Sequence, residues 1–241
     1  MVESKAFIYE DHVLFNKNKT ILIAYRAKET NYTIPNSVTI IGNSAFYGCE
    51  SLKSINIPNS VTTIGKGAFC GCDSLTSINI PNSVTMIGNW AFSLCKSLTS
   101  INISNSVTTI GEYAFSDCHS LTSITIPSSV VTIIGNPFCR WHGNLYNESK
   151  AFIYEDHVLF NKNKTTLIEY RAKETNYTIP NSVTTIGDHA FLNCLGLTSI
   201  TIPSSVTSLG DWCFCDCSGL TSITIPSSVP SLGEGCFNGC I

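Results

Sequence analysis

The chain has 241 residues, a formal net charge of −3 and only 13% charged residues, against roughly 25% in an average globular protein. Such a chain offers no basic surface for nucleic acid or an anionic membrane, and both are excluded as partners. Because 43% of the residues are hydrophobic, a disordered chain is excluded as well. No apolar run approaches the roughly 18 residues needed to cross a bilayer, so we expect no direct membrane insertion. Residues 1–7 carry acidic and basic side chains and do not resemble a signal peptide.

A charged cassette begins the chain. Val13-Leu14-Phe15 and Ile21–Tyr25 flank a polar turn, Asn16–Thr20, and this pattern predicts a β-hairpin. The cassette returns later, because residues 148–184 repeat residues 3–39 with two differences, Ile21 against Thr166 and Ala24 against Glu169. So close a copy indicates an internal duplication.

A 23-residue repeat fills most of the remaining chain. Each unit reads approximately Pro-Asn-Ser-Val-Thr-Thr-Ile-Gly, two variable residues, Ala-Phe, two more, Cys, two more, Leu-Thr-Ser-Ile-Thr-Ile. The phenylalanine marks eight units, at Phe46, Phe69, Phe92, Phe115, Phe138, Phe191, Phe214 and Phe237.

Each unit contains two strand-like segments. Leu52–Ile57 is short and β-branched, which predicts a strand that ends at Pro58. Val61–Gly65 predicts a second, shorter strand, ended by a glycine that can adopt a positive φ. One unit cannot bury its own apolar side chains, so the units must stack at the roughly 4.8 Å spacing of strands. The sequence therefore predicts a mainly β solenoid of stacked short parallel strands.

We expect one continuous solenoid over residues 1–241. It comprises a hairpin cassette (3–34), five repeats (35–139), an irregular rung with the second cassette (140–179) and three repeats (180–241), the last incomplete. In the irregular rung, Arg140–Tyr146 replaces the regular cysteine and strand, and we expect the stack to bend or to lose a rung there.

The repeat, with its Ile-Pro-Asn-Ser-Val-Thr-Thr-Ile-Gly pattern and Val-Leu-Phe-Asn-Lys-Asn-Lys hairpins, resembles the BspA-type leucine-rich repeat family over essentially the whole chain. The resemblance implies a leucine-rich-repeat solenoid and a role as a surface antigen or adhesin that binds host matrix proteins or other cells. It also implies a location at the cell surface or outside the cell. Because residues 1–7 resemble no signal peptide, a cytoplasmic location stays open.

Seven of the twelve cysteines recur with the core period, three residues after the phenylalanine. This position predicts a buried ladder of free thiols rather than disulfides between adjacent rungs. Cys213-Phe214-Cys215-Asp216-Cys217 has the wrong spacing for a zinc site, so no metal is expected. The sequence contains no Gly-x-Ser-x-Gly elbow, phosphate loop or His-Glu-x-x-His motif, and we expect neither an enzyme nor a cofactor.

Two surfaces are candidates for partner binding. The first is the outward face of the longer strands, a uniform array of hydroxyl and amide side chains that can supply many weak contacts. It comprises Thr99, Ser100 and Asn102, Thr122, Ser123 and Thr125, and Thr198 and Thr201. The second is the residue before the repeat alanine position, which is aromatic on two pairs of adjacent rungs, Trp90 with Tyr113 and His189 with Trp212. Packing against a local turn is the alternative interpretation of these aromatic residues.

Three functions remain open. An adhesive module would bind an extracellular matrix glycoprotein or a cell-surface protein, and an intracellular scaffold would fit the many cysteines. A third hypothesis is an ice-binding surface of regular Ser/Thr rungs. We also expect the chain to be a fragment or a truncated member of a longer protein, whose open solenoid ends could pair with a second copy.

Overall fold

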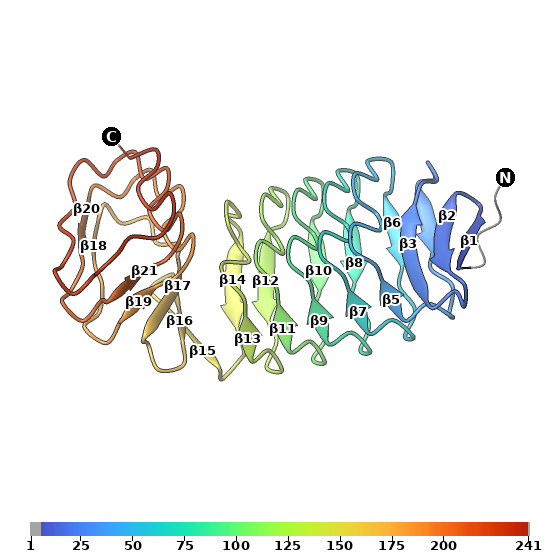
Figure 1. Cartoon of the computed structure of the whole chain (residues 1–241), viewed down its shortest axis with the longest axis horizontal. Helices are drawn as coiled ribbons and strands as arrows, with labels where there is room; N and C mark the ends of the chain where they lie inside the picture. The colour runs from blue at the N-terminus through green and yellow to red at the C-terminus, as the bar shows by residue number, and fades with distance from the viewer. Residues whose placement is uncertain (1–5, 241) are drawn as a thin grey trace. The chain divides into compact units, whose positions relative to one another are not determined.

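The computed structural model describes residues 6–240, which contain strands and turns and no helix (Figure 1). It comprises two compact units, Met1–Ser149 and Lys150–Ile241, each of which is described by itself. The mainly β solenoid of stacked parallel strands is confirmed. The continuity of one solenoid over residues 1–241 stays a prediction.

The first unit begins with three antiparallel strands. These are β1 (Phe7–Glu10), β2 (Val13–Asn16) and β3 (Ile21–Tyr25), of which β1 was not predicted. The turn between β1 and β2 places Asp11 and His12 at φ values of 45° and 61°, as a tight hairpin turn requires. In the next turn, Asn16 Oδ1 accepts hydrogen bonds from the backbone N–H of Thr20 at 2.8 Å and Ile21 at 2.9 Å. The predicted hairpin is therefore present and is held by its asparagine.

The hairpin continues into a ladder of two-residue parallel strands (Figure 1). Strand β3 pairs with β5 in the register Leu22↔Ile41. Each later short strand pairs with the short strand of the next rung. The ladder consists of β5 (Ile40–Ile41), β7 (Thr63–Ile64), β9 (Met86–Ile87), β11 (Thr109–Ile110) and β13 (Thr132–Ile133).

The longer strands form a second row, which is paired two by two (Figure 1). The pairs are β4 (Asn31–Thr33) with β6 (Ser54–Asn56), β8 (Ser77–Asn79) with β10 (Ser100–Asn102), and β12 (Ser123–Ile126) with β14 (Asn144–Asn147). Of the two predicted ladders, only the one made of the shorter strands is continuous. Isolated backbone bonds still join the pairs, such as Thr76 N–H to Lys53 O at 3.2 Å.

A stack of phenylalanine rings fills the interior between the two rows. Adjacent ring centroids lie 5.0 Å apart for Phe46 and Phe69 and 5.4 Å apart for Phe69 and Phe92. Tyr25 of the cassette begins the stack, 5.0 Å from Phe46. The cassette therefore shares the core of the repeats instead of forming a separate domain.

The repeat glycine has a different role from the predicted one. Gly65, Gly88 and Gly111 are absent from the residues with positive φ. They are needed because the neighbouring rung approaches closely: a Cβ atom on Gly111 would lie 2.4 Å from the backbone nitrogen of Asn89. Positive φ occurs instead at the residue before the repeat alanine and at the residue before the repeat cysteine, for example Trp90 and Leu94.

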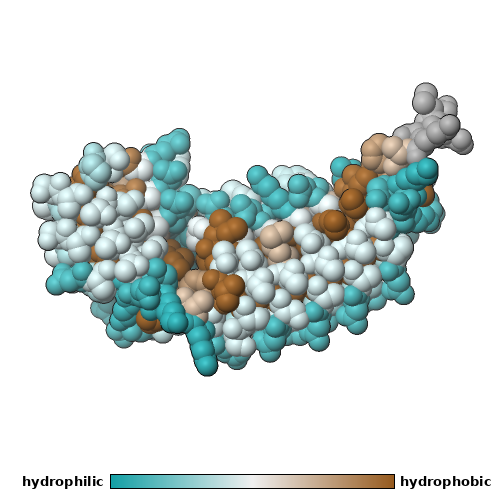
Figure 2. Space-filling model, turned by 60° about the horizontal axis from the view of Figure 1, so that its bottom comes forward, coloured by the Kyte–Doolittle hydropathy of each residue, from teal (hydrophilic) through white to brown (hydrophobic). Residues whose placement is uncertain are grey.

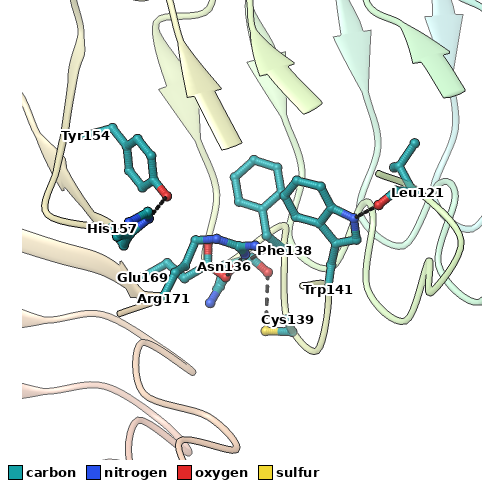
Figure 3. Close-up of polar contacts among 9 residues, drawn as sticks. All are labelled: Leu121, Asn136, Phe138, Cys139, Trp141, Tyr154, His157, Glu169 and Arg171. Carbon is teal, nitrogen blue, oxygen red and sulfur yellow. Dashed lines mark hydrogen bonds and ion pairs between the residues drawn. The ribbon is translucent and has the colours of Figure 1, made fainter. Parts of the chain in front are cut away.

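The irregular segment keeps its rung, so the loss of a rung, one of the two expected outcomes, is wrong, and the bend stays a prediction. Residues 144–147 form β14, which pairs with β12 in the register Thr125↔Tyr146. Trp141 replaces the repeat cysteine and is 2% exposed, and its indole N–H donates to Leu121 O at 2.7 Å (Figure 3). Because the indole fills the core and makes this bond, the segment can change in sequence without interrupting the stack.

The second unit repeats the same plan. Strands β15 (Phe152–Glu155), β16 (Val158–Asn161) and β17 (Thr166–Tyr170) form the antiparallel cassette. They continue into the short strands β19 (Thr185–Ile186) and β21 (Ser208–Leu209), while β18 (Asn176–Thr178) pairs with β20 (Ser199–Thr201). Tyr170 begins the ring stack here, 4.9 Å from Phe191.

The eighth rung has no strand within residues 221–240. In the rung before it, the N–H of Thr207 donates to Thr184 O at 2.8 Å. The corresponding residue of the eighth rung is Pro230, which has no N–H to donate. Proline thus removes the backbone hydrogen bond that would join the eighth rung to the short ladder.

Candidate functional site

The predicted Ser/Thr face is exposed in both units. Thr99 directly precedes β10, which carries Ser100 and Asn102, and Thr122 directly precedes β12, which carries Ser123 and Thr125. In the second unit Thr198 precedes β20, which carries Thr201. All eight side chains are exposed. The structure thus confirms where these residues lie, and their role in binding stays a prediction.

The hydroxyl groups of this face are partly used within the stack. Thr99 Oγ1 donates to Thr76 O at 3.0 Å, and Thr198 Oγ1 donates to Thr175 O at 3.0 Å. Asn102 Nδ2 likewise donates to Asn79 Oδ1 at 2.9 Å. A hydroxyl that donates its proton keeps its lone pairs as acceptors. The face therefore offers fixed hydrogen-bond acceptors, which suits a partner rich in N–H or O–H groups.

An open groove adjoins this face in the first unit, and the sequence reasoning missed it. It lies at the carboxyl ends of β6 and β8, which are not paired with each other. Four exposed asparagines and two prolines of the Ile-Pro-Asn-Ser turns line it: Asn36, Asn56, Asn59, Asn79, Pro58 and Pro81. The available signal was the asparagine two residues before and directly after Pro58 and Pro81. Only stacking shows that these amides gather at one place.

The aromatic candidates share an unusual backbone conformation. Trp90, Tyr113, His189 and Trp212 have φ values of 63°, 54°, 57° and 54°. A bulky residue rarely adopts this left-handed region, and the same position holds glycine at Gly67 and Gly235. Strain of this kind persists where the surrounding structure enforces it, and it is a reason to suspect function.

The two aromatic pairs differ in their surroundings. The rings of Trp90 and Tyr113 lie 4.1 Å apart between centroids, and Trp90 is 39% exposed. In the second unit, Trp212 covers Gly235 of the next rung, where a Cβ atom would lie 2.7 Å from the indole. Trp212 and His189 are only partly exposed, as is Tyr113, so Trp90 is the exposed ring of the four. The Trp90–Tyr113 pair is therefore the better candidate anchor.

The rungs of this face from Thr76 to Thr125 carry no charge, whereas the first rung places the exposed Lys53 in the column of Thr76 and Thr99. Charged side chains concentrate in the cassettes, where Lys19 pairs with Glu10 and Lys164 with Glu155. In the second cassette Arg171 Nη1 and Glu169 Oε1 form a buried ion pair at 2.9 Å. Figure 2 shows that much of the surface in view is pale, neither strongly hydrophilic nor strongly hydrophobic.

The cysteine ladder is mostly buried, as predicted. Cys72, Cys95, Cys118 and Cys217 are fully buried, and each thiol donates to the phenylalanine carbonyl of the rung before, as Cys95 does to Phe69 O at 3.2 Å. Cys49, Cys194 and Cys240 are partly exposed, which corrects the prediction for those three. Burial raises the pKa of Cys118 to about 12 and that of Cys49 to about 11. Cys49 and Cys118 therefore stay protonated near neutral pH and do not act as thiolate nucleophiles there.

Neither a metal cluster nor a membrane-spanning helix is found among the residues that the structure describes. Within residues 6–240, no group of three or more His, Cys, Asp or Glu side chains is placed to hold a metal ion. No helix in this range is long and apolar enough to cross a membrane.

The repeat geometry defines a leucine-rich-repeat solenoid, and comparison with known proteins agrees. Residues 24–142 and 168–241 match the family described as the BspA type leucine rich repeat region, in six copies. The chain belongs to this family. No curated protein is significantly similar to it in sequence.

Several solved structures resemble the chain. A leucine rich cell surface protein from Faecalibacterium prausnitzii is 28% identical, with a TM-score of 0.73 over 100% of this chain and 82% of that one. A leucine-rich repeat protein from Eubacterium ventriosum is 25% identical, with a TM-score of 0.64 over 97% and 69% of the two chains. The pneumococcal vaccine antigen PcpA, 20% identical over 95% and 72% with a TM-score of 0.75, shares the fold. Leucine-rich-repeat proteins are typically non-enzymatic scaffolds, and the family is consistent with a protein-interaction module.

The buried thiols predict a pH dependence of stability. In the unfolded chain a thiol ionises near pH 8.5, whereas burial keeps Cys95 and Cys118 protonated to higher pH because it raises the pKa of both. The contribution of these thiols to the free energy of unfolding should therefore be complete below about pH 8.5. Above that pH, the free energy of unfolding should fall as the pH rises. The expected slope is about 1.4 kcal/mol per pH unit for each such thiol.

Urea denaturation at pH 7.5, 9 and 10 measures this slope, before most tyrosines ionise. A Cys118→Ala variant should be less stable at pH 7.5 but should lose less stability between pH 7.5 and 10 than the unchanged protein. Equal losses in both proteins would show that Cys118 does not stay protonated in the folded state.

Proposed function

We propose that the chain is the adhesive, non-enzymatic module of a cell-surface protein, which binds an extracellular matrix glycoprotein or a protein on a partner cell. The observation that carries the proposal is the strand face from Thr76 to Thr125, whose uncharged rungs present exposed hydroxyl and amide groups at a fixed spacing. A location at the surface is supported by the similarity to the leucine rich cell surface protein from Faecalibacterium prausnitzii.

The chemistry of the face favours an extended partner. Its threonine hydroxyls already donate along the stack, so they remain available as acceptors for backbone or side-chain donors of a bound chain. Each such contact is weak. Several equal contacts in a row gain affinity through multivalency, without a single deep pocket. The groove asparagines extend the face with both donors and acceptors.

The intracellular scaffold is the second candidate, and the large number of cysteines, twelve, favours it. Thiol labelling of the protein isolated from its own host separates the two. Twelve reduced thiols would support an intracellular scaffold, because disulfides persist mainly in oxidising compartments.

A charge placed on the strand face should abolish binding. We expect Thr76→Lys, Thr99→Lys and Thr122→Lys together to weaken binding to immobilised fibronectin or fibrinogen at least tenfold, since like charges would stack and the acceptors would be lost. Surface plasmon resonance measures the affinity, and circular dichroism verifies the fold.

The matched control carries Thr62→Lys, Thr85→Lys and Thr108→Lys. These threonines are also exposed, and those at positions 62 and 108 also donate to the rung before, but they border the short ladder. The control should bind within twofold of the unchanged protein. Equal loss in both variants, or no saturable binding by the folded chain to any matrix glycoprotein, would refute the proposed site or the adhesive function, respectively.

The aromatic pair should contribute to binding but not to folding. Trp90→Gly with Tyr113→Gly installs the residue that the same position holds in Gly67 and relieves the positive-φ strain, about 1 kcal/mol for each residue. We therefore expect an unchanged or slightly higher melting temperature and at least a threefold weaker affinity for the same glycoprotein. A double variant that unfolds would show instead that the rings belong to the core.

A further inference from the structure

One column of the core changes its residue in the last two rungs. The residue before the repeat phenylalanine is a buried alanine in five of the first six rungs and proline in the other: Ala45, Ala68, Ala91, Ala114, Pro137 and Ala190. In the seventh and eighth rungs it is Cys213 and Cys236. Because side chains of one column lie on each other, this substitution places two thiols face to face.

The structure brings the two sulfur atoms into contact. Cys213 Sγ and Cys236 Sγ lie 3.1 Å apart, and the residues are 0% and 3% exposed. Stacked rungs keep corresponding Cα atoms about 4.8 Å apart, which lies within the range that a disulfide spans. The ladder thiols Cys194 and Cys217 also interact through their side chains, but Cys217 in addition donates to a backbone carbonyl, Phe191 O, at 3.0 Å.

The eighth rung is held to the seventh by fewer contacts than the other rungs have. Pro230 removes its strand hydrogen bond, and Leu232 is 53% exposed, whereas Leu209 in the rung before is 4% exposed. The rung is held by turn bonds, such as Phe214 N–H to Cys236 O at 2.9 Å, and by the stacking of Phe214 on Phe237 at 5.5 Å. It is thus the rung least secured by the β ladder.

We propose that Cys213 and Cys236 form a disulfide that fastens the eighth rung to the seventh. The oxidant is a small-molecule or protein disulfide. One cysteine sulfur attacks it and releases the first thiol, and the second cysteine sulfur then displaces the other. The two cysteines lose two electrons and two protons in total, and the oxidant is reduced to two thiols. A disulfide persists mainly in an oxidising compartment, which agrees with the proposed surface location, but the test of the bond does not depend on adhesive binding.

The reaction has a direction and a route. The hydrogen bond from the Cys213 thiol lowers the pKa of Cys236, although burial opposes this, and so favours Cys236 as the attacking thiolate. Opening of the eighth rung gives access, because few backbone bonds hold it.

The test oxidises the purified full chain with glutathione disulfide, blocks the remaining thiols, and maps the links by mass spectrometry. Cleavage after Phe214 and after Phe237 separates Cys213 from Cys215 and Cys236 from Cys240, so the link can be assigned. Cys213→Ala restores the alanine of the other rungs and should fold. Cys215→Ala, also buried, is the matched control.

We expect a peptide pair that joins residues 213 and 236 in the unchanged chain and in Cys215→Ala, and none in Cys213→Ala. Amide hydrogen exchange at Cys236 and Asn238 should slow at least tenfold on oxidation. Recovery of both cysteines as free thiols, or a link of either to Cys194, Cys217 or Cys240, would overturn the proposal. So would a link with unchanged exchange, since the bond would then fasten nothing.

Discussion

The structure depends on one constraint, the 23-residue register that places each side chain on its own copy in the next rung. The phenylalanine rings show it most clearly, with adjacent centroids between 4.9 and 6.1 Å apart. The register also explains the glycine column, because the backbone of one rung fills the space where the Cβ atom of the next would lie. In the cysteine column, it brings each thiol to a carbonyl of the rung before.

The same register accounts for the composition of the surface. A charged residue at a repeat position would face an equal charge on the next rung at about 4.8 Å, which is unfavourable. The repeats therefore use threonine, serine and asparagine, which can bond to their own copies as Asn102 does to Asn79. Lys96 and Asp73 stack as an opposite pair at 2.9 Å. In the second unit Asp188, Asp211 and Glu234 share one column, and there the carboxylates of Asp188 and Asp211 accept hydrogen bonds from the backbone N–H of the next rung. An almost uncharged, repetitive face is thus a consequence of stacking, and it is also the feature that suits an extended partner.

Much of the fold is predictable from the sequence because the period is visible eight times. The strands, the proline turns, the ring stack and the hairpin follow from residues such as Phe69, Pro58 and Asn16. The backbone conformation does not follow, since a repeated glycine can signal either positive φ or close approach. Gly111 turned out to mark close approach, while Trp90, an unfavourable residue for it, adopts positive φ. Trp141 takes the core position of the repeat cysteine, and its indole N–H donates to Leu121 O. The repeat pattern, which has cysteine at this position, does not predict that hydrogen bond.

The candidate site is predictable in part for the same reason. Exposure of Thr99 and Thr122 follows from the alternation of side chains along a strand. The hydrogen bond from Thr99 to the preceding rung and the asparagine groove depend on how the rungs pair, which the sequence does not show. The thiol contact between Cys213 and Cys236 was visible in the sequence only by comparing one column across all rungs. In this chain, comparing equivalent positions of successive repeats identifies candidate functional residues better than searching for linear motifs does.

The most direct test of the register is cross-linking between adjacent rungs. Ser77 and Ser100 are exposed partners in the parallel pair of β8 with β10, so cysteines at both positions should oxidise to a disulfide in the folded protein. Cysteines at positions 77 and 123, two rungs apart, should not, since their Cα atoms would lie about 9.6 Å apart, beyond the reach of a disulfide. Efficient closure of the first pair alone is the predicted result. Closure of the second pair, or of neither, would contradict the stacking on which the account rests.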